Sequence, residues 1–372
     1  MSVIECRLRY QSASPHLQQL YTGFHLLRKA GRVRLSQEIR RDPIRYLNEA
    51  SHLRDAGHAH LDVSLDGGVR LHFDTHDAQE IALGELPNCD VYFKRSYRRE
   101  EVDLLPPDQR GKVRPLGLNY RVLPDEVDTA ALSRGLSTAR SLRGVLSALK
   151  QTLDTNNQFG FEPRLSRMEA APDVEVAPRV LFLVAAYDPY EDPGRTRDKI
   201  EARVSINETR ARCLRLLKAE LGPAFVGGFS RSPFTLRQYG DLVVPPERTS
   251  QESYLRTVRS FPICVASTGL HGSIGWKLAE YVAFSKAILS ERLLYQVPGD
   301  FGPGRNYVEF TTPESCLEGA LRLMKDAALR QQLMKNNAAY YRDYLRPDAL
   351  VWNALITALE RASARESSDR AA

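Results

Sequence analysis

The sequence predicts an α/β protein with two domains. Its 372 residues, 42% of them hydrophobic, supply enough apolar material for sizeable cores and exceed the usual length of one domain. Short apolar runs with strand character alternate with amphipathic helical stretches, which predicts βαβ units and a parallel sheet covered on both faces. From residue 154 to residue 179 a polar, aperiodic stretch containing Pro and Asn interrupts this alternation and indicates a domain boundary.

The first predicted domain spans residues 1–160. Its strands are indicated by alternating apolar residues, and its helices by apolar residues every three or four positions. Asp66-Gly67-Gly68 separates two alternating runs and predicts the turn of a β-hairpin. The predicted elements are a strand over 3–10, a helix over 16–31, the two hairpin strands, strands over 89–97 and 112–122, and a helix over about 129–153.

The second predicted domain spans residues 180–345 and follows a linker over 161–179. The buried run "VLFLVAAY" opens it as a new strand, and helices and strands alternate from there. A C-terminal helix is expected over 346–361, and the polar tail over 362–372 is expected to be disordered. The other predicted elements are helices over 200–221 and 251–260 and strands over 224–230, 263–267 and 287–291.

Composition and charge exclude several classes of protein. The net charge of +6 fits an anionic ligand such as a nucleotide as well as it fits an ordinary soluble protein, and no dense basic run indicates a nucleic-acid partner. The five cysteines are far apart and form no CxxC pair, so neither a disulfide framework nor a zinc site is expected. No signal sequence and no apolar run long enough to span a bilayer is seen. We therefore expect a soluble, cytoplasmic protein, with peripheral membrane contact left open.

The segment 267–289, "STGLHGSIGWKLAEYVAFSKAIL", has the pattern of a phosphate-binding turn. It follows a strand, and ligands of open α/β sheets bind at the carboxyl ends of strands. Gly272 lets the backbone approach a ligand closely, and Ser273 is the predicted N-cap of a helix whose first N–H groups attract phosphate. Lys277 and Glu280, three residues apart, share one helical face, where the lysine suits a diphosphate and the carboxylate suits a ribose diol. A capped helix with a solvated ion pair is the alternative.

The C-terminal half resembles nucleotide-sugar-dependent glycosyltransferases of the GT-B group, and within it the family often called group 1, or family 4-like. That family has a Glu-Ala-x-Ala-x-Gly-x-Pro-Val-Ile segment, and this sequence has "EYVAFSKAIL", with Glu280 in the position of the glutamate. The order of elements matches over roughly 267–341. The resemblance implies two Rossmann-like domains facing across a cleft, with the acceptor in the first and the nucleotide sugar in the second. It also implies that Glu280 binds the ribose hydroxyls of the donor.

Two departures from the family pattern stand in this segment. Retaining members of the group often carry a second glutamate eight residues earlier, where this sequence has Gly272. Ser285-Lys286-Ala287 replaces the usual glycine and proline.

Other donor-binding candidates rest on their position after predicted strands. Arg231 follows "VGGFS", and Arg195 and Arg197 follow "VLFLVAAYDP". An arginine near a pyrophosphate is physically sensible, with an ordinary surface residue as the alternative in each case. The segment "FGPGRNY", 301–307, is either a contact for the donor sugar or base, or a plain glycine-rich loop.

Acceptor-binding candidates follow two strands of the first domain. Lys94 and Arg95 come after "CDVYF", and "PLGLNYRV" offers Asn119 and Tyr120. These side chains are predicted to hold an acceptor sugar or phosphate, with a solvated strand end as the alternative.

No metal site and no catalytic residue is assigned from the sequence. "HFDTHD", 72–77, has metal-like spacing, but His72 alternates along a strand for packing reasons. "DPYED", 188–192, lies in a Pro-broken loop and is no convincing Asp-x-Asp motif. His25 and Asp90 are candidate bases if the reaction inverts the anomeric carbon, and neither is favoured.

The sequence thus predicts a glycosyltransferase that moves a sugar from a nucleotide sugar to a glycan, a lipid-linked acceptor or another hydroxyl, in surface polysaccharide synthesis by family analogy. No cofactor beyond the nucleotide-sugar substrate is expected. A nicotinamide-dependent oxidoreductase is one alternative, since Gly269, Gly272 and Gly275 precede Glu291 by about 20 residues. Their spacing is G-x-x-G-x-x-G, however, and not that of the dinucleotide fingerprint. A non-catalytic carbohydrate-binding or scaffold protein is the other alternative.

Overall fold

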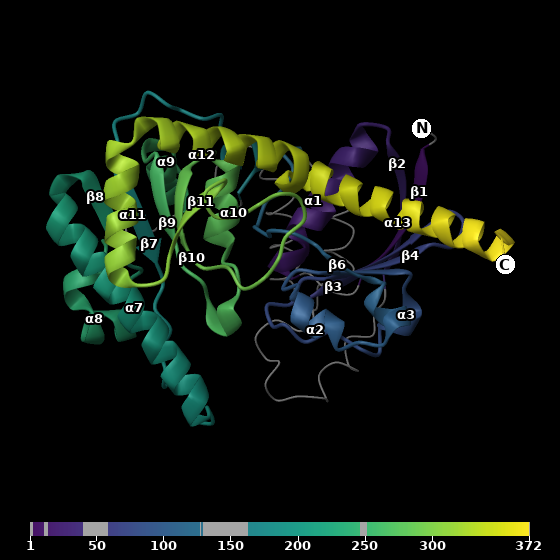
Figure 1. The fold of residues 1–372 in the computed structure, drawn as a ribbon, viewed down its shortest axis with the longest axis horizontal. Helices are drawn as coiled ribbons and strands as arrows, with labels where there is room; N and C mark the ends of the chain where they lie inside the picture. The colour runs from purple at the N-terminus through teal and green to yellow at the C-terminus, as the bar shows by residue number, and fades with distance from the viewer. Residues whose placement is uncertain are drawn as a thin grey trace, which may run out of the picture. The chain divides into compact units, whose positions relative to one another are not determined.

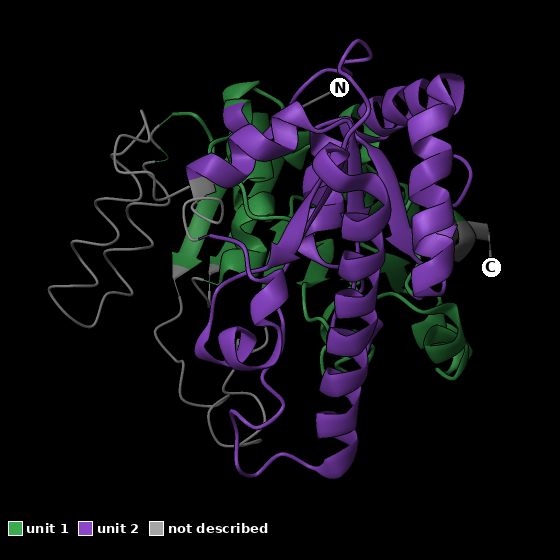
Figure 2. Cartoon of the chain, turned by 90° about the vertical axis from the view of Figure 1, so that its left-hand side faces the viewer, with its two compact units in different colours: residues 1–166, 295–299, 342–372 green, residues 167–294, 300–341 purple. Residues whose placement is uncertain are grey.

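The chain forms two compact units in a computed structural model, shown in Figure 2. The chain first passes from unit 1 to unit 2 between Ser166 and Arg167, and from Arg342 onward it belongs to unit 1 again. The predicted helix over 129–153 lies outside the described residues. Unit 1 comprises residues 1–166, 295–299 and 342–372, and unit 2 comprises residues 167–294 and 300–341. The structure describes residues 3–10, 14–39, 59–126, 128, 163–245 and 251–371.

Unit 1 contains a six-stranded mixed sheet in the order β2-β1-β3-β4-β5-β6. The strands are β1 (Ile4–Tyr10), β2 (Val33–Ile39), β3 (His60–Leu65), β4 (Arg70–Asp74), β5 (Val91–Lys94) and β6 (Val113–Pro115). The hairpin predicted at Asp66-Gly67-Gly68 is confirmed, and both glycines have a positive φ, 83° and 87°. This tight turn reverses the chain between β3 and β4, so these two strands are antiparallel. β3 also runs antiparallel to β1, whereas the other neighbouring pairs are parallel.

The largest core of unit 1 lies between one face of this sheet and two helices, α1 (Gln18–Lys29) and α13 (Pro347–Ala371). The two helices pack closely at Gly23, where a Cβ atom would lie 2.2 Å from the carbonyl oxygen of Pro347. A smaller core on the other face includes Tyr92 and Val102 of α2 (Arg99–Asp103). The remaining short elements of the unit are helix α3 (Pro107–Arg110) and the 3₁₀ turns η1 (Pro15–Leu17) and η2 (Leu86–Asn88).

Helix α13 differs from the expectation for the C-terminus. It continues to Ala371 and so includes the segment 362–371, for which the sequence predicted disorder. Half of the ten residues of this segment are Ala or Arg, which have high helix propensity, and none is Gly or Pro, so the preceding helix can continue through it.

Unit 2 contains a five-stranded, fully parallel sheet in the order β11-β10-β9-β7-β8, which confirms the predicted α/β class (Figure 1). In chain order this is the doubly wound 2-1-3-4-5 arrangement, whose ligand-binding switch point lies between the first and third strands, here β7 and β9. Every residue of these two strands is buried, as expected when helices cover both faces. The strands are β7 (Val180–Val184), β8 (Phe225–Phe229), β9 (Ile263–Ala266), β10 (Ala287–Glu291) and β11 (Tyr307–Phe310).

The helices of unit 2 connect these strands. The first ten residues of α7 are mostly exposed and project beyond the sheet, as Figure 1 shows. None of the helices in the described ranges is long and apolar enough to cross a membrane. The helices are α6 (Leu165–Met168, at the boundary of the units), α7 (Arg197–Leu221), α8 (Pro233–Gln238), α9 (Gln251–Ser260), α10 (Trp276–Ala283), α11 (Pro313–Lys325) and α12 (Ala327–Tyr340).

Candidate functional site

Arg210 of α7 joins the two loops at the switch point of the unit 2 sheet. Its Nη1 donates to the carbonyl oxygen of Ala185, after β7, at 2.7 Å. Its Nη2 donates to the carbonyl oxygen of Thr268, after β9, at 2.8 Å, and its Nε to Ser267 Oγ at 3.0 Å. The guanidinium carbon also lies 5.1 Å from the ring centroid of Tyr187. Sequence analysis missed Arg210, because its position in mid-helix carries no local signal.

Among the residues that the structure describes, no carboxylate balances the charge of Arg210. The side chain is buried, with 5% of the residue exposed, and its partners are two carbonyl groups, a hydroxyl and an aromatic ring. No carboxylate in the described part of unit 2 forms an ion pair with it. Burying a cation without a counter-charge costs free energy, and an anion bound at this edge of the sheet would offset that cost.

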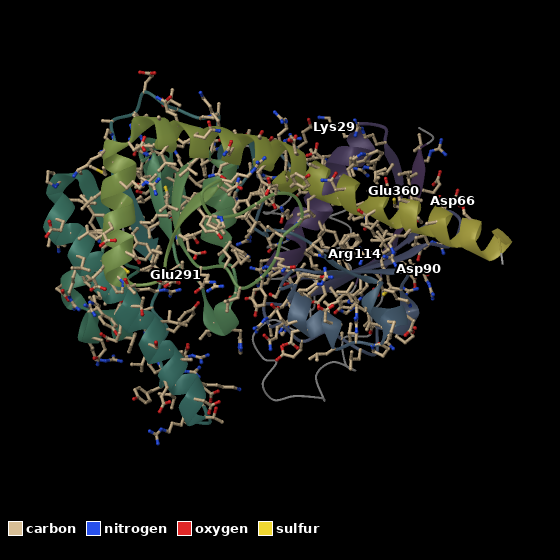
Figure 3. All side chains as sticks on the ribbon, in the orientation of Figure 1. Lys29, Asp66, Asp90, Arg114, Glu291 and Glu360 are labelled. Atoms are coloured by element: carbon tan, nitrogen blue, oxygen red, sulfur yellow. The ribbon has the colours of Figure 1, made fainter. Side chains whose placement is uncertain are left out.

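Glu291, at the end of β10, fixes the start of the same loop from the other side; Figure 3 labels this residue. Its Oε2 accepts hydrogen bonds from the backbone N of Thr268 at 2.6 Å and from Thr268 Oγ1 at 2.8 Å. With Arg210 bound to the carbonyl oxygen, every polar group of Thr268 is held. The loop between β9 and α10 therefore starts from a rigid point.

The turn that follows has an unusual backbone. His271 and Gly272 both have a positive φ, 58° and 66°. A Cβ atom on Gly269 would lie 2.8 Å from Ser273 Oγ, and one on Gly272 would lie 2.6 Å from Leu294 Cδ1. Position 272 is the one at which retaining members of the group that the sequence resembles often carry a glutamate. Here its left-handed backbone conformation favours glycine and disfavours that side chain.

Helix α10 begins at Trp276, with Gly275 as its N-cap and no side-chain hydrogen bond at the cap. The prediction that Ser273 caps this helix is wrong, because Ser273 lies two residues too early and its carbonyl oxygen instead accepts from Gly269 N at 2.8 Å. An α-helix whose first turn has no side-chain cap presents backbone N–H groups and the positive end of its dipole to a ligand.

Lys277 and Glu280 lie on one face of α10, and both contact Tyr254 of α9. The Lys277 Nζ lies 4.0 Å from the ring centroid, and Tyr254 Oη donates to Glu280 Oε2 at 2.5 Å. Burial and the Glu280 carboxylate raise the pKa of Tyr254. Burial lowers the pKa of Lys277; Glu280 opposes this shift, and Arg210 adds to it. The structure therefore brings the two predicted donor residues together and adds Tyr254, for which the sequence gave no specific signal.

The turn after α10 explains one departure from the family pattern. Ser285 stands where the family has glycine, and it keeps the left-handed conformation, with a φ of 53°. Its Oγ donates to the carbonyl oxygen of Ala170 at 2.7 Å. This hydrogen bond offsets part of the conformational cost of a side chain at that position.

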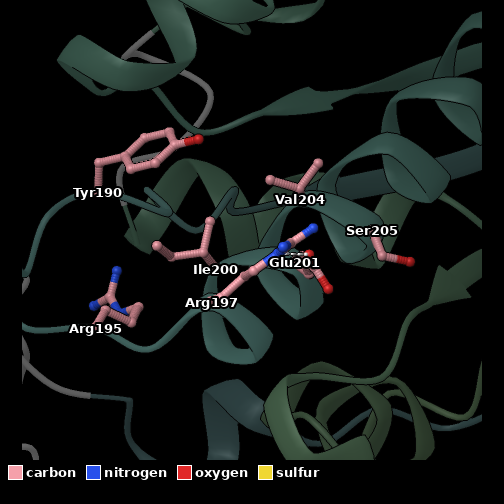
Figure 4. A pocket seen from close by; sticks show the side chains of 7 residues that line it. All are labelled: Tyr190, Arg195, Arg197, Ile200, Glu201, Val204 and Ser205. Atoms are coloured by element: carbon pink, nitrogen blue, oxygen red, sulfur yellow. Dashed lines mark hydrogen bonds and ion pairs between the residues drawn. The ribbon is translucent and has the colours of Figure 1, made fainter.

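The other predicted donor residues do not contact Arg210 or Lys277 within the described residues. Arg231 is exposed after β8. Arg195 Nη1 donates to the carbonyl oxygens of Asp188 and Pro189, both at 2.8 Å. Arg197 pairs with Glu201 at 2.7 Å, and 92% of its side chain is exposed. Arg195 and Arg197 line a separate open hollow of about 640 Å³, shown in Figure 4 with its other lining residues Tyr190, Ile200, Glu201, Val204 and Ser205.

The segment 301–307 packs against its own unit. The Phe301 ring contacts Tyr307 and Tyr340, with centroids 5.7 and 4.6 Å away. Asn306 Nδ2 donates to Asn337 Oδ1 at 3.1 Å. These contacts anchor the loop to α12.

In unit 1, Lys94 is part of a buried ion pair. It is 1% exposed, and its Nζ donates to Asp74 Oδ2 at 2.9 Å. Tyr92 Oη donates to the same oxygen at 2.5 Å. Burial alone would raise the pKa of Asp74, but Lys94 and Tyr92 outweigh it and hold this pKa below its usual range. Lys94 therefore faces Asp74 rather than solvent.

Arg95 and Asn119 both contact His16, in η1. Arg95, 6% exposed, donates from Nη1 to the Asp77 carboxylate and to His16 Nδ1, the latter at 3.0 Å. Asn119 Nδ2 donates to the carbonyl oxygen of His16 at 3.0 Å, and Tyr120 is fully buried. The sequence missed His16 and Asp77 as partners, although Asp77 closes the "HFDTHD" segment considered for metal binding. No group of three metal-type ligands occurs among the residues that the structure describes.

The two candidate bases lie away from the carboxyl edge of β4, β5 and β6. His25 is buried in α1, with Nδ1 3.3 Å from Asp128 Oδ1. Asp90 directly precedes β5, at the amino end of that strand, and accepts from the backbone N of Arg70 at 2.8 Å.

Comparison with known proteins gives no family. No protein-family model matches the chain, and no curated protein matches it. Solved structures that match include the C-terminal domain of a glycosyl transferase group 1 family protein (LpcC) from Francisella tularensis, at 12% identity over 48% of this chain and 95% of that one, with a TM-score of 0.33.

A TarM mutant from S. aureus, in complex with fondaparinux, alpha-GlcNAc-glycerol and UDP, matches at 13% identity over 56% of this chain and 42% of that one, with a TM-score of 0.33. A protein from Listeria monocytogenes described as a UDP-N-acetylglucosamine 2-epimerase matches at 10% identity over 75% of this chain and 61% of that one, with a TM-score of 0.34. This chain thus spans less than two thirds of these last two proteins. At TM-scores this low, these matches do not indicate an activity for this chain.

Proposed function

We propose that this protein is a glycosyltransferase that binds the diphosphate of a nucleotide-sugar donor at the carboxyl edge of the unit 2 sheet, between β7 and β9. The observation that carries the proposal is Arg210, a buried cation at the switch point whose partners among the described residues are all uncharged. A diphosphate bound there supplies the missing counter-charge.

The start of α10 supports the same assignment. Its first turn has no side-chain cap, and a helix N-terminus stabilises a bound anion by roughly 0.3–1 kcal/mol in exposed settings and more when the site is partly buried. Lys277, the second residue of the helix, adds a second positive charge. These groups stabilise the nucleoside diphosphate as it departs, so the proposed mechanism has no obligatory metal.

Glu280 is the proposed partner of the donor ribose. Its Oε2 accepts from Tyr254, and no side chain in the described ranges bonds to Oε1, which can therefore accept from a ribose hydroxyl. The proposed acceptor is a hydroxyl of a glycan, free or lipid-linked, in keeping with the sequence resemblance.

Nucleotide binding tests the proposal directly. UDP, GDP and CMP are added to the full chain in thermal unfolding, with NAD(H) as the comparison. A nucleotide at a hundredfold excess over its Kd stabilises the folded state by about 2.7 kcal/mol. A shift with NAD(H) alone would favour an oxidoreductase, and no shift with any nucleotide would favour a non-catalytic protein.

Arg210→Gln should weaken binding of the nucleoside diphosphate at least about tenfold, a loss of roughly 1.4 kcal/mol, and leave binding of the nucleoside nearly unchanged. The physical reason is that glutamine removes the charge from the diphosphate site. Calorimetric titration of the diphosphate and the nucleoside measures both values at a temperature where the variant is folded.

The matched control is Arg212→Gln, two residues away on the same helix, where the side chain is 66% exposed and pairs with Glu314. It should bind like the wild type. Equal losses of diphosphate and nucleoside affinity in Arg210→Gln would show that Arg210 only supports the loops.

A further inference from the structure

Two hydroxyl groups lie beside Gly269, in the turn between β9 and α10. A Cβ atom at this position would lie 2.8 Å from Ser273 Oγ and 3.1 Å from Tyr187 Oη. Tyr187 belongs to the loop after β7, so the two hydroxyls come from the two loops that meet at the switch point. The backbone of Gly269 has a φ of −100° and a ψ of −163°, an extended conformation that alanine also adopts. Glycine at this position therefore leaves space for the two hydroxyls rather than relieving backbone strain.

Neither hydroxyl has a hydrogen-bond partner among the residues that the structure describes. Ser273 is 7% exposed, and its hydrogen bonds within the described ranges come from its backbone N and its carbonyl oxygen. Tyr187 is half-buried and is likewise hydrogen-bonded there through its backbone. The hydroxyl of nearby Thr268, by contrast, donates to Glu291. A buried hydroxyl without a partner costs free energy, and a ligand that accepts from both hydroxyls would remove that cost.

Helix α7 holds Tyr187 in this position. Asn207, which is fully buried, accepts from the backbone N of Tyr187 at 2.9 Å and donates to its carbonyl oxygen at 2.7 Å. Arg210, three residues further along the same face of α7, lies against the tyrosine ring, with its guanidinium carbon 5.1 Å from the centroid. Two buried polar side chains thus fix the backbone and the ring of Tyr187, and its hydroxyl keeps the capacity to bind a ligand.

The charge beside the hydroxyl pair favours an anionic ligand. Arg210 contacts the Tyr187 ring and also donates to the carbonyl oxygen of Thr268, the residue before Gly269. Hydrogen bonds to a charged acceptor are about twice as strong as those between neutral groups. A phosphate oxygen therefore gains more from these two donors than an uncharged sugar hydroxyl does.

The position of the pair along the chain indicates which phosphate it contacts. Glu280, the proposed partner of the ribose, is the fifth residue of α10, and Lys277 is the second. Gly269 and Ser273 precede the helix, on the side away from Glu280. A donor whose ribose lies at Glu280 and whose first phosphate lies at the start of α10 therefore brings its outer phosphate to the hydroxyl pair.

We propose that the hydroxyls of Tyr187 and Ser273 bind the outer phosphate of the nucleoside diphosphate, and that this pair lets the site distinguish a diphosphate from a monophosphate. The inference rests on the proposed function. Each hydroxyl donates to one oxygen of that phosphate, in addition to the attraction of the Arg210 charge.

Calorimetric titration of UDP, UMP, GDP and GMP against the full chain tests this subsite. Tyr187→Phe removes only the hydroxyl and keeps the ring against Arg210, and Ser273→Ala removes the other hydroxyl. Each variant should bind the preferred diphosphate about tenfold less tightly, as expected for loss of a hydrogen bond to a charged group, and the matching monophosphate within about twofold of the wild type. Gly269→Ala should act in the same direction, because its methyl group would displace both hydroxyls.

Tyr190→Phe and Gly240→Ala are the matched controls. Tyr190 lies in the same loop as Tyr187 and is 71% exposed. A Cβ atom on Gly240, elsewhere in unit 2, would meet no described residue within 4 Å. Both variants should bind the monophosphate and the diphosphate like the wild type.

The inference alone is overturned if folded Tyr187→Phe or Ser273→Ala binds the diphosphate like the wild type, or loses as much affinity for the monophosphate as for the diphosphate. A wild-type chain that binds no nucleoside diphosphate would overturn the proposed function and this inference with it.

Discussion

Lys94→Met is expected to lower the free energy of unfolding by about 3–5 kcal/mol at pH 7, because it leaves the Asp74 carboxylate buried without its cation. Lys94 is 1% exposed and 2.9 Å from Asp74 Oδ2, so solvent cannot take over its role. Urea unfolding measures the loss, and an unchanged m-value confirms that the denatured state is comparable.

The same variant should lose its defect as the pH falls. The pKa of Asp74 is lowered in the folded wild type, so this residue contributes stability that is fully present above its unfolded-state pKa, near 4, and lost as the pH falls through its folded-state pKa. Without Lys94, burial raises the pKa of Asp74 in the folded state. The variant is therefore less stable than the wild type only at a pH where Asp74 is ionised in the unfolded chain. The difference between the two proteins should therefore be largest at neutral pH and shrink below about pH 4.

Lys29→Met provides the matched control. Lys29 pairs with Glu126 on the surface, where 58% and 60% of the two side chains are exposed, and Figure 3 labels it. Exposed pairs contribute about 0–1 kcal/mol, so this variant should lose little. A loss in Lys94→Met as small as that in Lys29→Met would contradict the buried pair. It would also revive the prediction that Lys94 is an accessible acceptor ligand.

Glu280→Gln is expected to weaken binding of a ribonucleoside diphosphate by about ten- to hundredfold. A hydrogen bond to a charged group contributes roughly 1.5–3 kcal/mol, and glutamine keeps the shape of the side chain while removing its charge. The 2′-deoxy analogue should bind less well than the ribonucleotide in the wild type, whereas the two should differ much less in the variant. Calorimetric titration of UDP and 2′-deoxy-UDP against both proteins gives the four affinities.

Tyr254→Phe separates ribose binding from a purely structural role of Glu280. It removes the hydroxyl that donates to Glu280 Oε2 at 2.5 Å but keeps the carboxylate and the ring under Lys277. If Glu280 only anchors α10 to α9, both variants should lose stability and neither should distinguish ribose from deoxyribose. Additive losses in the cycle of variant and sugar would rule out the ribose assignment.

Local patterns in the sequence determined several features of this protein. The alternation of strands and helices predicted the α/β class, and Asp66-Gly67-Gly68 predicted the hairpin, since both depend on neighbouring residues. The spacing of Lys277 and Glu280 predicted that they share a face of one helix, which helical periodicity alone requires. They do so on α10.

The tertiary structure alone decided which charges are balanced. Whether a cation keeps an unpaired charge depends on the side chains that the fold packs around it, and those come from distant parts of the chain. Arg210 binds Thr268, 58 residues away, and its lack of a carboxylate partner appears only once α7 packs against the ends of β7 and β9. Lys94 and Arg95 are adjacent in sequence, yet the pleat of β5 and the chain beyond it direct Lys94 to buried Asp74 and Arg95 to half-exposed Asp77. Sequence patterns could place these cations near a strand end, but they could not show which of them the fold would neutralise.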